Sequence, residues 1–284
     1  MLDLVQGISQ APHNYTYVLM GKPGSGKTTL AGTFPKPLLY VSIEKDGGGE
    51  VLKCYNDNDV KLLQLNSDKP GTPNAKNIQQ KVMELLNDLS GDHPYKTVVI
   101  DAYSSIEESM VNYFEKVKGK KLSLDERGTV GTLMLQLRDK IVELSDKVHY
   151  VLVTHIKDKE TTDNTTGEKT TMIIPKMSYN NGNLLLERAS IVAYCSKRTV
   201  INEDGSRRVA FLTYIGAHPN MDTKFRTEGK KLESGMYIEN ATFDKLEELR
   251  NSKQAVDNIE KLNVVESQEN PFSDNDNKDE GEDW

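Results

Sequence analysis

One eight-residue segment constrains the fold of this chain more than any other feature. It reads Gly21-Lys22-Pro23-Gly24-Ser25-Gly26-Lys27-Thr28 and matches the pattern G-x-x-x-x-G-K-[ST] at every fixed position. A β-branched and aromatic run ends just before it at Met20, and Pro35 and Pro37 limit the helix that follows to a short one. The glycines let backbone amides converge on an anion, and the helix points its positive end at the same place. The segment therefore predicts a phosphate-binding loop.

Side chains in and after this loop have separate expected roles. Lys27 supplies a mobile charge for the β- and γ-phosphates of a nucleotide, and Thr28 offers its hydroxyl to Mg²⁺. Thr29 and the loop residues 21–28 complete the expected nucleotide-binding set, with ATP and Mg²⁺ as ligands. A chance glycine-rich loop is the alternative, and the flanking strand and helix argue against it.

Apolar runs alternate with helical periodicity over the first 155 residues, which predicts an α/β fold with a mainly parallel sheet and helical crossovers. Turn-forming residues at 163–167 predict either a hairpin or a mobile loop over 157–171. Short later strands predict an antiparallel extension. The expected strands cover 15–20, 38–43, 61–65, 97–101, 150–154, 191–194 and 209–215. One short helix is expected to begin near residue 27, and the other expected helices cover 75–90, 105–117, 130–148 and 242–262. A loop is expected over 118–128.

Two carboxylates follow predicted parallel strands and should therefore reach the same end of the sheet as the phosphate loop. Asp101 ends the buried run 97–100 and is expected to hold Mg²⁺ through water. Glu44 follows the run 38–43 and is expected to position the water that attacks the nucleotide. The alternatives are an ordinary helix-capping aspartate and a solvated glutamate beside Lys45.

The fourth strand of this set ends in Thr154 and His155, again at the same end of the sheet. A polar residue there could contact the γ-phosphate and report its presence, which makes His155 a candidate sensor. An ordinary loop histidine is the alternative. The remaining histidines have no cysteine or carboxylate spacing that indicates a metal site.

The charge of the chain is unevenly distributed. Eight of its 43 acidic residues lie in 264–284, where Lys278 is the only base, so 35 acidic and 35 basic residues remain in 1–263. The net charge of −7 thus belongs to a stretch poor in apolar residues, for which we expect disorder. This stretch ends in Trp284 and resembles the acidic tails of single-strand DNA-binding proteins. Docking on a replication or recombination partner, or competition with DNA, is one interpretation, and a solubilising terminus is the other.

Several protein classes are disfavoured by the composition. No apolar run approaches the roughly 18–20 residues of a membrane helix. The first ten residues lack the pattern of a secretory signal. The two cysteines, Cys54 and Cys195, are not expected to form a disulfide framework or a four-ligand zinc site. We therefore expect a cytoplasmic protein without membrane association.

Two basic clusters are candidates for binding single-stranded nucleic acid, which usually combines cations with stacking aromatic rings. One comprises four lysines between 116 and 121 beside Tyr113 and Phe114, and the other comprises Lys197, Arg198, Arg207 and Arg208. Because residues 1–263 are neutral overall, such a site would be a local patch. A solvated charged face is the alternative.

In its order of parts the chain resembles the RecA-like recombinase ATPase core. A phosphate loop is followed by Glu44 after the next strand, then Asp101, then His155 leading into the segment 157–171. The sequence looks most like the phage-encoded RecA-like ATPases of the Sak type, which promote single-strand annealing, and the resemblance covers roughly residues 12–232. A phage-encoded protein of this kind would act in the host cytoplasm.

This resemblance implies further roles for named residues. Glu44 takes the place of the catalytic glutamate, and His155 that of the polar residue linking the γ-phosphate to DNA. Segments 116–131 and 157–171 resemble the first and second DNA-binding loops. ATP would lie between protomers of a homo-oligomer, with Lys224 and Arg226 as candidates to complete a neighbour's site. A solvated basic turn is the alternative for these two residues.

The resemblance also predicts the domain organisation, and the departures from RecA bear on how the protein would assemble. We expect a RecA-like ATPase core over 1–240, a helix over 241–263 and a disordered acidic tail over 264–284. About 14 residues precede the first strand, so the N-terminal arm that joins RecA protomers is not expected. A ring or short assemblies on DNA are therefore as compatible with the sequence as a filament.

The sequence-based expectation is a Mg²⁺-dependent, DNA-stimulated ATPase that binds single-stranded DNA. A small-molecule kinase is disfavoured because residues 157–171 contain lysines but no arginine for a phosphate-binding lid. A GTPase is disfavoured because the nearest match to Asn-Lys-x-Asp lies at 277–280 and ends in Glu280. An ATP-dependent loader or scaffold of a replication complex remains the alternative.

Overall fold

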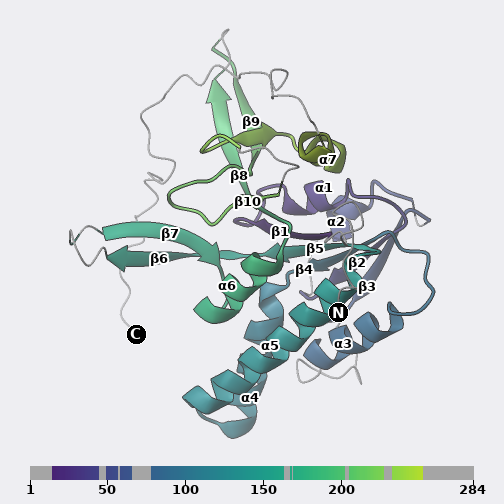
Figure 1. Cartoon of the computed structure of the whole chain (residues 1–284), viewed down its shortest axis with the longest axis vertical. Helices are drawn as coiled ribbons and strands as arrows, with labels where there is room; N and C mark the ends of the chain where they lie inside the picture. The colour runs from purple at the N-terminus through teal and green to yellow at the C-terminus, as the bar shows by residue number, and fades with distance from the viewer. Residues whose placement is uncertain are drawn as a thin grey trace, which may run out of the picture. The chain divides into compact units, whose positions relative to one another are not determined.

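A mixed β-sheet forms the centre of the molecule, with helices on both faces (Figure 1). The structure is a computed structural model that describes residues 15–44, 49–56, 58–65, 78–162, 167, 169–201, 205–226 and 232–251. Within these residues the sheet has nine strands, in the order β11-β9-β8-β1-β5-β4-β2-β3 with β10 beside β8. The strands are β1 (Thr16–Met20), β2 (Leu38–Ser42), β3 (Val60–Gln64), β4 (Thr97–Asp101), β5 (His149–Thr154), β8 (Ile191–Ile201), β9 (Arg207–Tyr214), β10 (Lys224–Phe225) and β11 (Tyr237–Glu239).

The strands from β3 to β8 in this order run parallel, whereas β9, β10 and β11 pair antiparallel with their neighbours. Parallel pairing suits the central strands β1, β2, β4 and β5 because they are buried along almost their whole length, as the sequence of β1, TYVLM, illustrates. The predicted α/β fold with a mainly parallel sheet and an antiparallel extension is confirmed.

Helices cover the two faces of the sheet. Four of them, α3 (Ile78–Asp88), α4 (Ser104–Lys118), α5 (Leu124–Leu144) and α6 (Tyr179–Arg188), pack against one face and bury a continuous apolar core. On the opposite face lie α1 (Lys27–Ala31), the adjacent short α2 (Gly49–Leu52) and α7 (Phe243–Asn251), as Figure 1 shows. The register places Ser42 beside Asp101 and Met20 beside Thr154, so the carboxyl ends of β1, β2, β4 and β5 meet at one end of the sheet. We call it the carboxyl end.

The loop predicted over 118–128 is partly wrong. Helix α4 ends at Lys118 and is followed by the capping residue Gly119, whose φ of 65° lies in the left-handed region that favours glycine. Helix α5 already begins at Leu124, because Ser123 and Glu126 form a reciprocal capping box at its start. The connection between the two helices is therefore only a few residues long, and the lysines it carries lie at the tip of a helical hairpin.

Three other outcomes concern the second half of the chain. Helix α6 was not predicted from the sequence. Of the two alternatives predicted for residues 157–171, the hairpin is confirmed, because β6 (Ile156–Thr162) and β7 (Lys169–Pro175) pair antiparallel. Strand β8 continues to Ile201, seven residues past its predicted end, because β9 pairs with it over that length.

The predicted helix over 242–262 is present as α7 as far as Asn251. Its remainder and the predicted disordered tail over 264–284 lie outside the described residues. Among the helices of the described ranges, none combines the length and apolar character that crossing a membrane requires.

Candidate nucleotide-binding site

The predicted phosphate loop connects β1 to α1 at the carboxyl end of the sheet. Gly24 and Gly26 have φ angles of 71° and 88°, which residues other than glycine rarely adopt. Gly21 is needed for a different reason, because a β-carbon there would lie 2.4 Å from the carbonyl oxygen of Cys195. The three glycines of the loop are therefore explained by backbone geometry and by close contact with β8.

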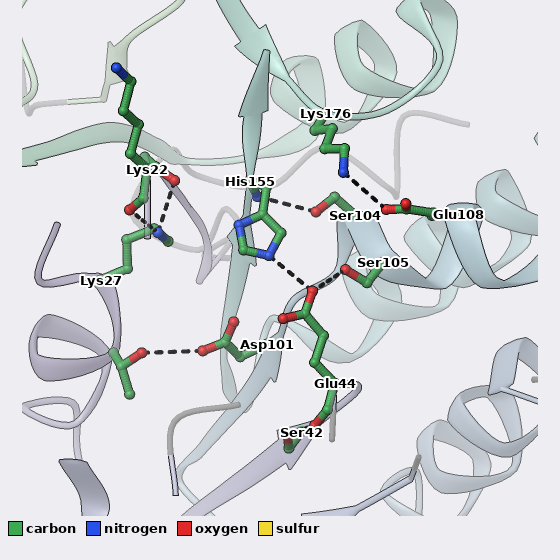
Figure 2. Close-up of polar contacts among 12 residues, drawn as sticks. Lys22, Lys27, Ser42, Glu44, Asp101, Ser104, Ser105, Glu108, His155 and Lys176 are labelled. Atoms are coloured by element: carbon green, nitrogen blue, oxygen red, sulfur yellow. Dashed lines mark hydrogen bonds and ion pairs between the residues drawn. The ribbon is translucent and has the colours of Figure 1, made fainter. Parts of the chain in front are cut away.

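Lys27 is only 7% exposed and its ammonium group folds back over the loop. Its Nζ donates hydrogen bonds to the carbonyl oxygens of Gly21 and Lys22, both at 2.8 Å, as Figure 2 shows for Lys22. Burial lowers the pKa of Lys27. Its third hydrogen bond goes to the Ser25 hydroxyl at 3.5 Å. A buried cation held by neutral groups is well suited to binding an anion such as a phosphate.

Thr28 of α1 and Asp101 at the end of β4, which are predicted to hold Mg²⁺ together, lie side by side at the carboxyl end of the sheet. The Thr28 hydroxyl donates to Oδ2 of Asp101 at 3.2 Å (Figure 2), and the Tyr40 hydroxyl donates to the same oxygen. Burial raises the pKa of Asp101. A hydroxyl and a buried carboxylate are the hard oxygen donors that Mg²⁺ prefers, so the residues present fit the expected ion.

Glu44 and His155 contact each other directly at the carboxyl end of the sheet (Figure 2). His155 Nε2 lies 2.9 Å from Oε1 of Glu44, and the Ser105 hydroxyl donates to the same oxygen at 2.6 Å. These hydrogen bonds, chiefly the one from His155, lower the pKa of Glu44 to about 2. Glu44 is therefore ionised at neutral pH, as a residue that orients or deprotonates water must be.

The β6–β7 hairpin is anchored beside this group. The backbone amide of His155 donates to the Ser104 hydroxyl at 3.1 Å, and the amide of Lys176 donates to the His155 carbonyl at 2.8 Å. At the start of α6, the amide of Ser178 donates to Glu107 at 3.0 Å. The first turn of α4 thus contacts Glu44, His155 and the segment that follows the hairpin.

The two residues predicted to act on a neighbouring protomer lie away from the phosphate loop of their own chain. The register of β10 pairs Lys224 with Val192, in the amino half of β8. The phosphate loop instead follows Met20, which pairs with Tyr194 further along β8. Lys224 Nζ donates to two carbonyl oxygens at the end of α6, at 2.7 and 3.3 Å. Arg226 follows β10 and is exposed.

The two basic clusters have different surroundings. At the tip between α4 and α5, Lys118 pairs with Glu126 and the neighbouring lysines are exposed. On the β8–β9 hairpin, Arg208 pairs with Glu239, and Lys197 extends toward the phosphate loop. The second cluster is therefore divided between an ion pair and the nucleotide site.

Sequence reasoning missed two polar partners of the site, Ser105 and Tyr40. Ser105 lies in the first turn of α4, shortly after Asp101 ends β4. Its position at this strand–helix junction could have indicated a role in the site. Tyr40 lies in a buried apolar run, and only the pairing of β2 with β4 brings its hydroxyl to Asp101.

A family model described as an AAA domain, AAA_24, matches residues 13–227. No curated protein matches the sequence. The RadB recombinase structure has 12% identity and a TM-score of 0.46, over 81% of this chain and 87% of that one. FlaH, a flagellar accessory protein from Methanocaldococcus jannaschii, has 12% identity and a TM-score of 0.42, over 72% and 78%. An ATPase from the type III secretion system of pathogenic bacteria has 11% identity and a TM-score of 0.44, over 64% of this chain.

This chain spans about half of that secretion ATPase, 51% of its length. The three structural similarities assign no activity here. The family match is of a different kind, because it covers well over half of the chain and includes the phosphate loop, Glu44, Asp101 and the β6–β7 hairpin. The chain therefore belongs to the AAA domain family of P-loop proteins.

Proposed function

We propose that this chain is a Mg²⁺-dependent ATPase stimulated by single-stranded DNA, acting in recombination or strand annealing of the phage type. The observation that carries the proposal is the hydrogen-bonded group of Glu44, His155 and Ser105. This group joins an ionised carboxylate at the carboxyl end of the sheet to the hairpin that resembles a DNA-binding loop. Nucleotide chemistry and DNA contact would then share one set of hydrogen bonds.

The phosphate end of ATP would bind the loop amides and the ammonium group of Lys27. The buried ammonium would exchange its bonds to neutral carbonyls for bonds to phosphate oxygens, which gains charge–charge attraction at low dielectric. Thr28 and Asp101 would hold Mg²⁺, which when bound offsets negative charge that develops on the transferred phosphoryl group.

Glu44 would orient the attacking water. Its low pKa keeps it an acceptor, and it is 44% exposed, so water can reach the carboxylate. His155 and Ser105 fix one carboxylate oxygen by two hydrogen bonds. Such fixed positioning reduces the reorganisation that the reaction would otherwise require.

DNA would influence hydrolysis through the root of the β6–β7 hairpin. His155 is the last residue before β6, and its backbone bonds both to Ser104 and to Lys176. A shift of the hairpin on binding DNA would therefore act directly on the histidine that holds Glu44. The side chain of Lys157, at the start of the hairpin, donates to the carbonyl of Met177 at 2.6 Å and closes the same root.

The tip between α4 and α5 is the proposed second DNA contact. Lys116, Lys120 and Lys121 are exposed there beside Leu124, which is 87% exposed. Cations next to an apolar side chain suit the phosphates and unstacked bases of a single strand. Phe114, by contrast, packs against the core and is not part of this surface.

A homo-oligomer with ATP between protomers would use Arg226 rather than Lys224 in the neighbouring site. The Lys224 ammonium already caps α6, whereas the Arg226 side chain is exposed. Mixing a Lys27→Ala subunit with an Arg226→Ala subunit would restore partial activity if the arginine acts on its neighbour. Activity in the mixture equal to the sum of the separate variants would contradict action between subunits.

The main test measures ATP hydrolysis with and without single-stranded DNA. We expect strong stimulation in the wild type, and no hydrolysis in Lys27→Ala with or without DNA. Hydrolysis at the wild-type rate in Lys27→Ala would overturn the site assignment. ATP binding without any stimulation would instead favour an ATP-dependent loader or scaffold.

The DNA surface is tested by replacing Lys120 and Lys121 with alanine. We expect weaker DNA binding and a salt dependence of log K that is shallower by about 0.7 per lysine removed. Lys140→Ala is the matched control, because that lysine lies on α5 in an ion pair with Glu143. An unchanged salt slope in the double variant would exclude the tip from the DNA site.

A further inference from the structure

The β8–β9 hairpin extends past the carboxyl end of the sheet, over the phosphate loop. Met20, the last residue of β1, pairs with Tyr194, and β8 then continues to Ile201 paired only with β9. The hairpin thus projects into the region where the loop follows Met20.

One pair of facing residues on the hairpin touches the loop. Lys197 and Phe211 are partners in the register of β8 and β9. A β-carbon built on Gly26 would lie 3.1 Å from Cδ1 of Phe211, and one built on Gly24 would lie 3.9 Å from Nζ of Lys197. An aromatic ring and an ammonium group therefore lie side by side over the glycines that would bind phosphate.

The face that carries these two residues is exposed, and much of it is apolar. Phe211 is 40% exposed, and Val209 and Ile201, on the same side of the pleat, are 58% and 65% exposed. The alternate residues Ala210 and Leu212 are buried in the core, as the two-residue period of a strand requires. A phenylalanine ring that is accessible beside a phosphate loop suits a ligand that has both an anionic and an aromatic part.

We propose that the β8–β9 hairpin completes the nucleotide site within one protomer. Phe211 stacks on the base of the bound nucleotide, and Lys197 contacts its phosphates. This inference rests on nucleotide binding at residues 21–28, and it adds the part of the site that recognises the nucleoside. A nucleoside triphosphate has the required chemistry, because its anionic end fits the loop and its planar base fits the ring.

The test separates the base from the phosphates by comparing ATP with inorganic pyrophosphate. We expect Phe211→Ala to raise the Kd for ATP about ten-fold, from the loss of one base–aromatic stacking contact, and to leave the Kd for pyrophosphate unchanged. We expect Lys197→Ala to raise both dissociation constants. Val209→Ala is the matched control, since it removes an apolar side chain of the same face without removing a ring.

A second variant keeps the proposal testable if Phe211→Ala does not fold. Trp284 is the only tryptophan of the chain, so Phe211→Trp in a Trp284→Phe background introduces a single fluorophore at the hairpin. We expect ATP to quench its fluorescence, wild-type-like affinity for ATP, and no quenching by pyrophosphate. Absence of quenching at saturating ATP would overturn base stacking.

Other occupants of this face give different results. If Phe211→Ala weakens single-stranded DNA binding or self-association but leaves the Kd for ATP unchanged, the proposal is overturned. Failure of the proposed function has a separate signature, namely ATP binding that depends on Phe211 without stimulation of hydrolysis by DNA. Loss of ATP binding in Lys27→Ala confirms that the loop is the site being measured.

Discussion

The two ends of strand β5 each carry a histidine near a glutamate, but the two surroundings differ in burial. At the carboxyl end, His155 bonds Glu44, whose side chain is 44% exposed. At the amino end, His149 lies between the rings of Tyr15 and Phe243, with centroids 4.5 and 5.1 Å away. The first histidine keeps a carboxylate ionised beside solvent, and the second is held among rings.

The amino end is closed by helix α7. Tyr17 is completely buried, and its hydroxyl lies 3.3 Å from Nδ1 of His149 and donates to Glu247 of α7 at 3.2 Å. Arg250 of the same helix lies over the ring of Tyr15, 5.6 Å from its centroid. Burial, and secondarily the charge of Arg250, lowers the pKa of His149 to about 4.

For the two histidine–glutamate groups, solvent access more than residue type separates function from structure. At the carboxyl end, the Glu44 side chain is 44% exposed, whereas the Glu247 side chain at the amino end is 21% exposed. At the amino end, similar residue types are enclosed by α7 and stabilise its attachment. Changes at the first end should alter catalysis, and changes at the second should alter stability.

The largest expected effect is the loss of hydrolysis in Glu44→Gln. The amide keeps the shape of the side chain but cannot accept a proton, so we expect kcat to fall about 10²–10⁴-fold while ATP affinity and Tm stay near wild type. Steady-state hydrolysis and ATP titration measure both. Glu108→Gln is the control, because that exposed carboxylate pairs with Lys176 outside the site. Turnover near the wild-type rate in Glu44→Gln would refute the catalytic role.

At the opposite end, Phe34→Ala should cost stability without affecting catalysis. Phe34 is 1% exposed and its ring lies 4.9 Å from those of both Tyr17 and Phe243. Removing it leaves a cavity, for which we expect a loss of about 3–5 kcal/mol in the free energy of unfolding. Urea unfolding measures this, with Leu124→Ala as an exposed control expected to change little. Equal stabilities of Phe34→Ala and wild type would remove the distinction between the ends.

The sequence predicts those parts of the site that follow from a local residue pattern and from the parallel direction of the strands. The phosphate loop is contiguous, and Glu44, Asp101 and His155 each follow an apolar run, so parallel pairing alone predicts that they meet. Their catalytic and metal-binding roles stay predictions until mutants are measured.

The remaining contacts depend on pairing between distant segments. The Tyr40 hydroxyl reaches Asp101 because of the β2–β4 register, and Phe211 reaches Gly26 because β8 and β9 extend past the sheet. The start of α5 was missed because the Ser123 capping box lies within a polar stretch that resembles a loop. Composition and periodicity contain no information about such registers.

A smaller effect is expected from the titration of His149. Its folded-state pKa of about 4 lies below the ordinary value of 6.5, so the unfolded chain binds a proton first as the pH falls. This contribution to stability is complete above pH 6.5 and is lost between 6.5 and 4. Since the ring is partly exposed, we expect a loss of about 1–2 kcal/mol from pH 7 to pH 5. Urea unfolding of His149→Gln at both values should show a shallower dependence, and an unchanged slope would exclude this histidine as its source.

The smallest expected effect returns to the carboxyl end and tests how firmly Glu44 must be held. Ser105→Ala removes the 2.6 Å hydrogen bond to Glu44 but leaves the bond from His155. Because solvent can replace part of the lost interaction, we expect a cost of about 1 kcal/mol, which is about a five-fold decrease in kcat with KM unchanged. Ser90→Ala is the matched control, since its hydroxyl bonds only to the end of α3. If Ser105→Ala instead raised KM with kcat intact, the serine would act on nucleotide binding, and the carboxyl end would position Glu44 through His155 alone.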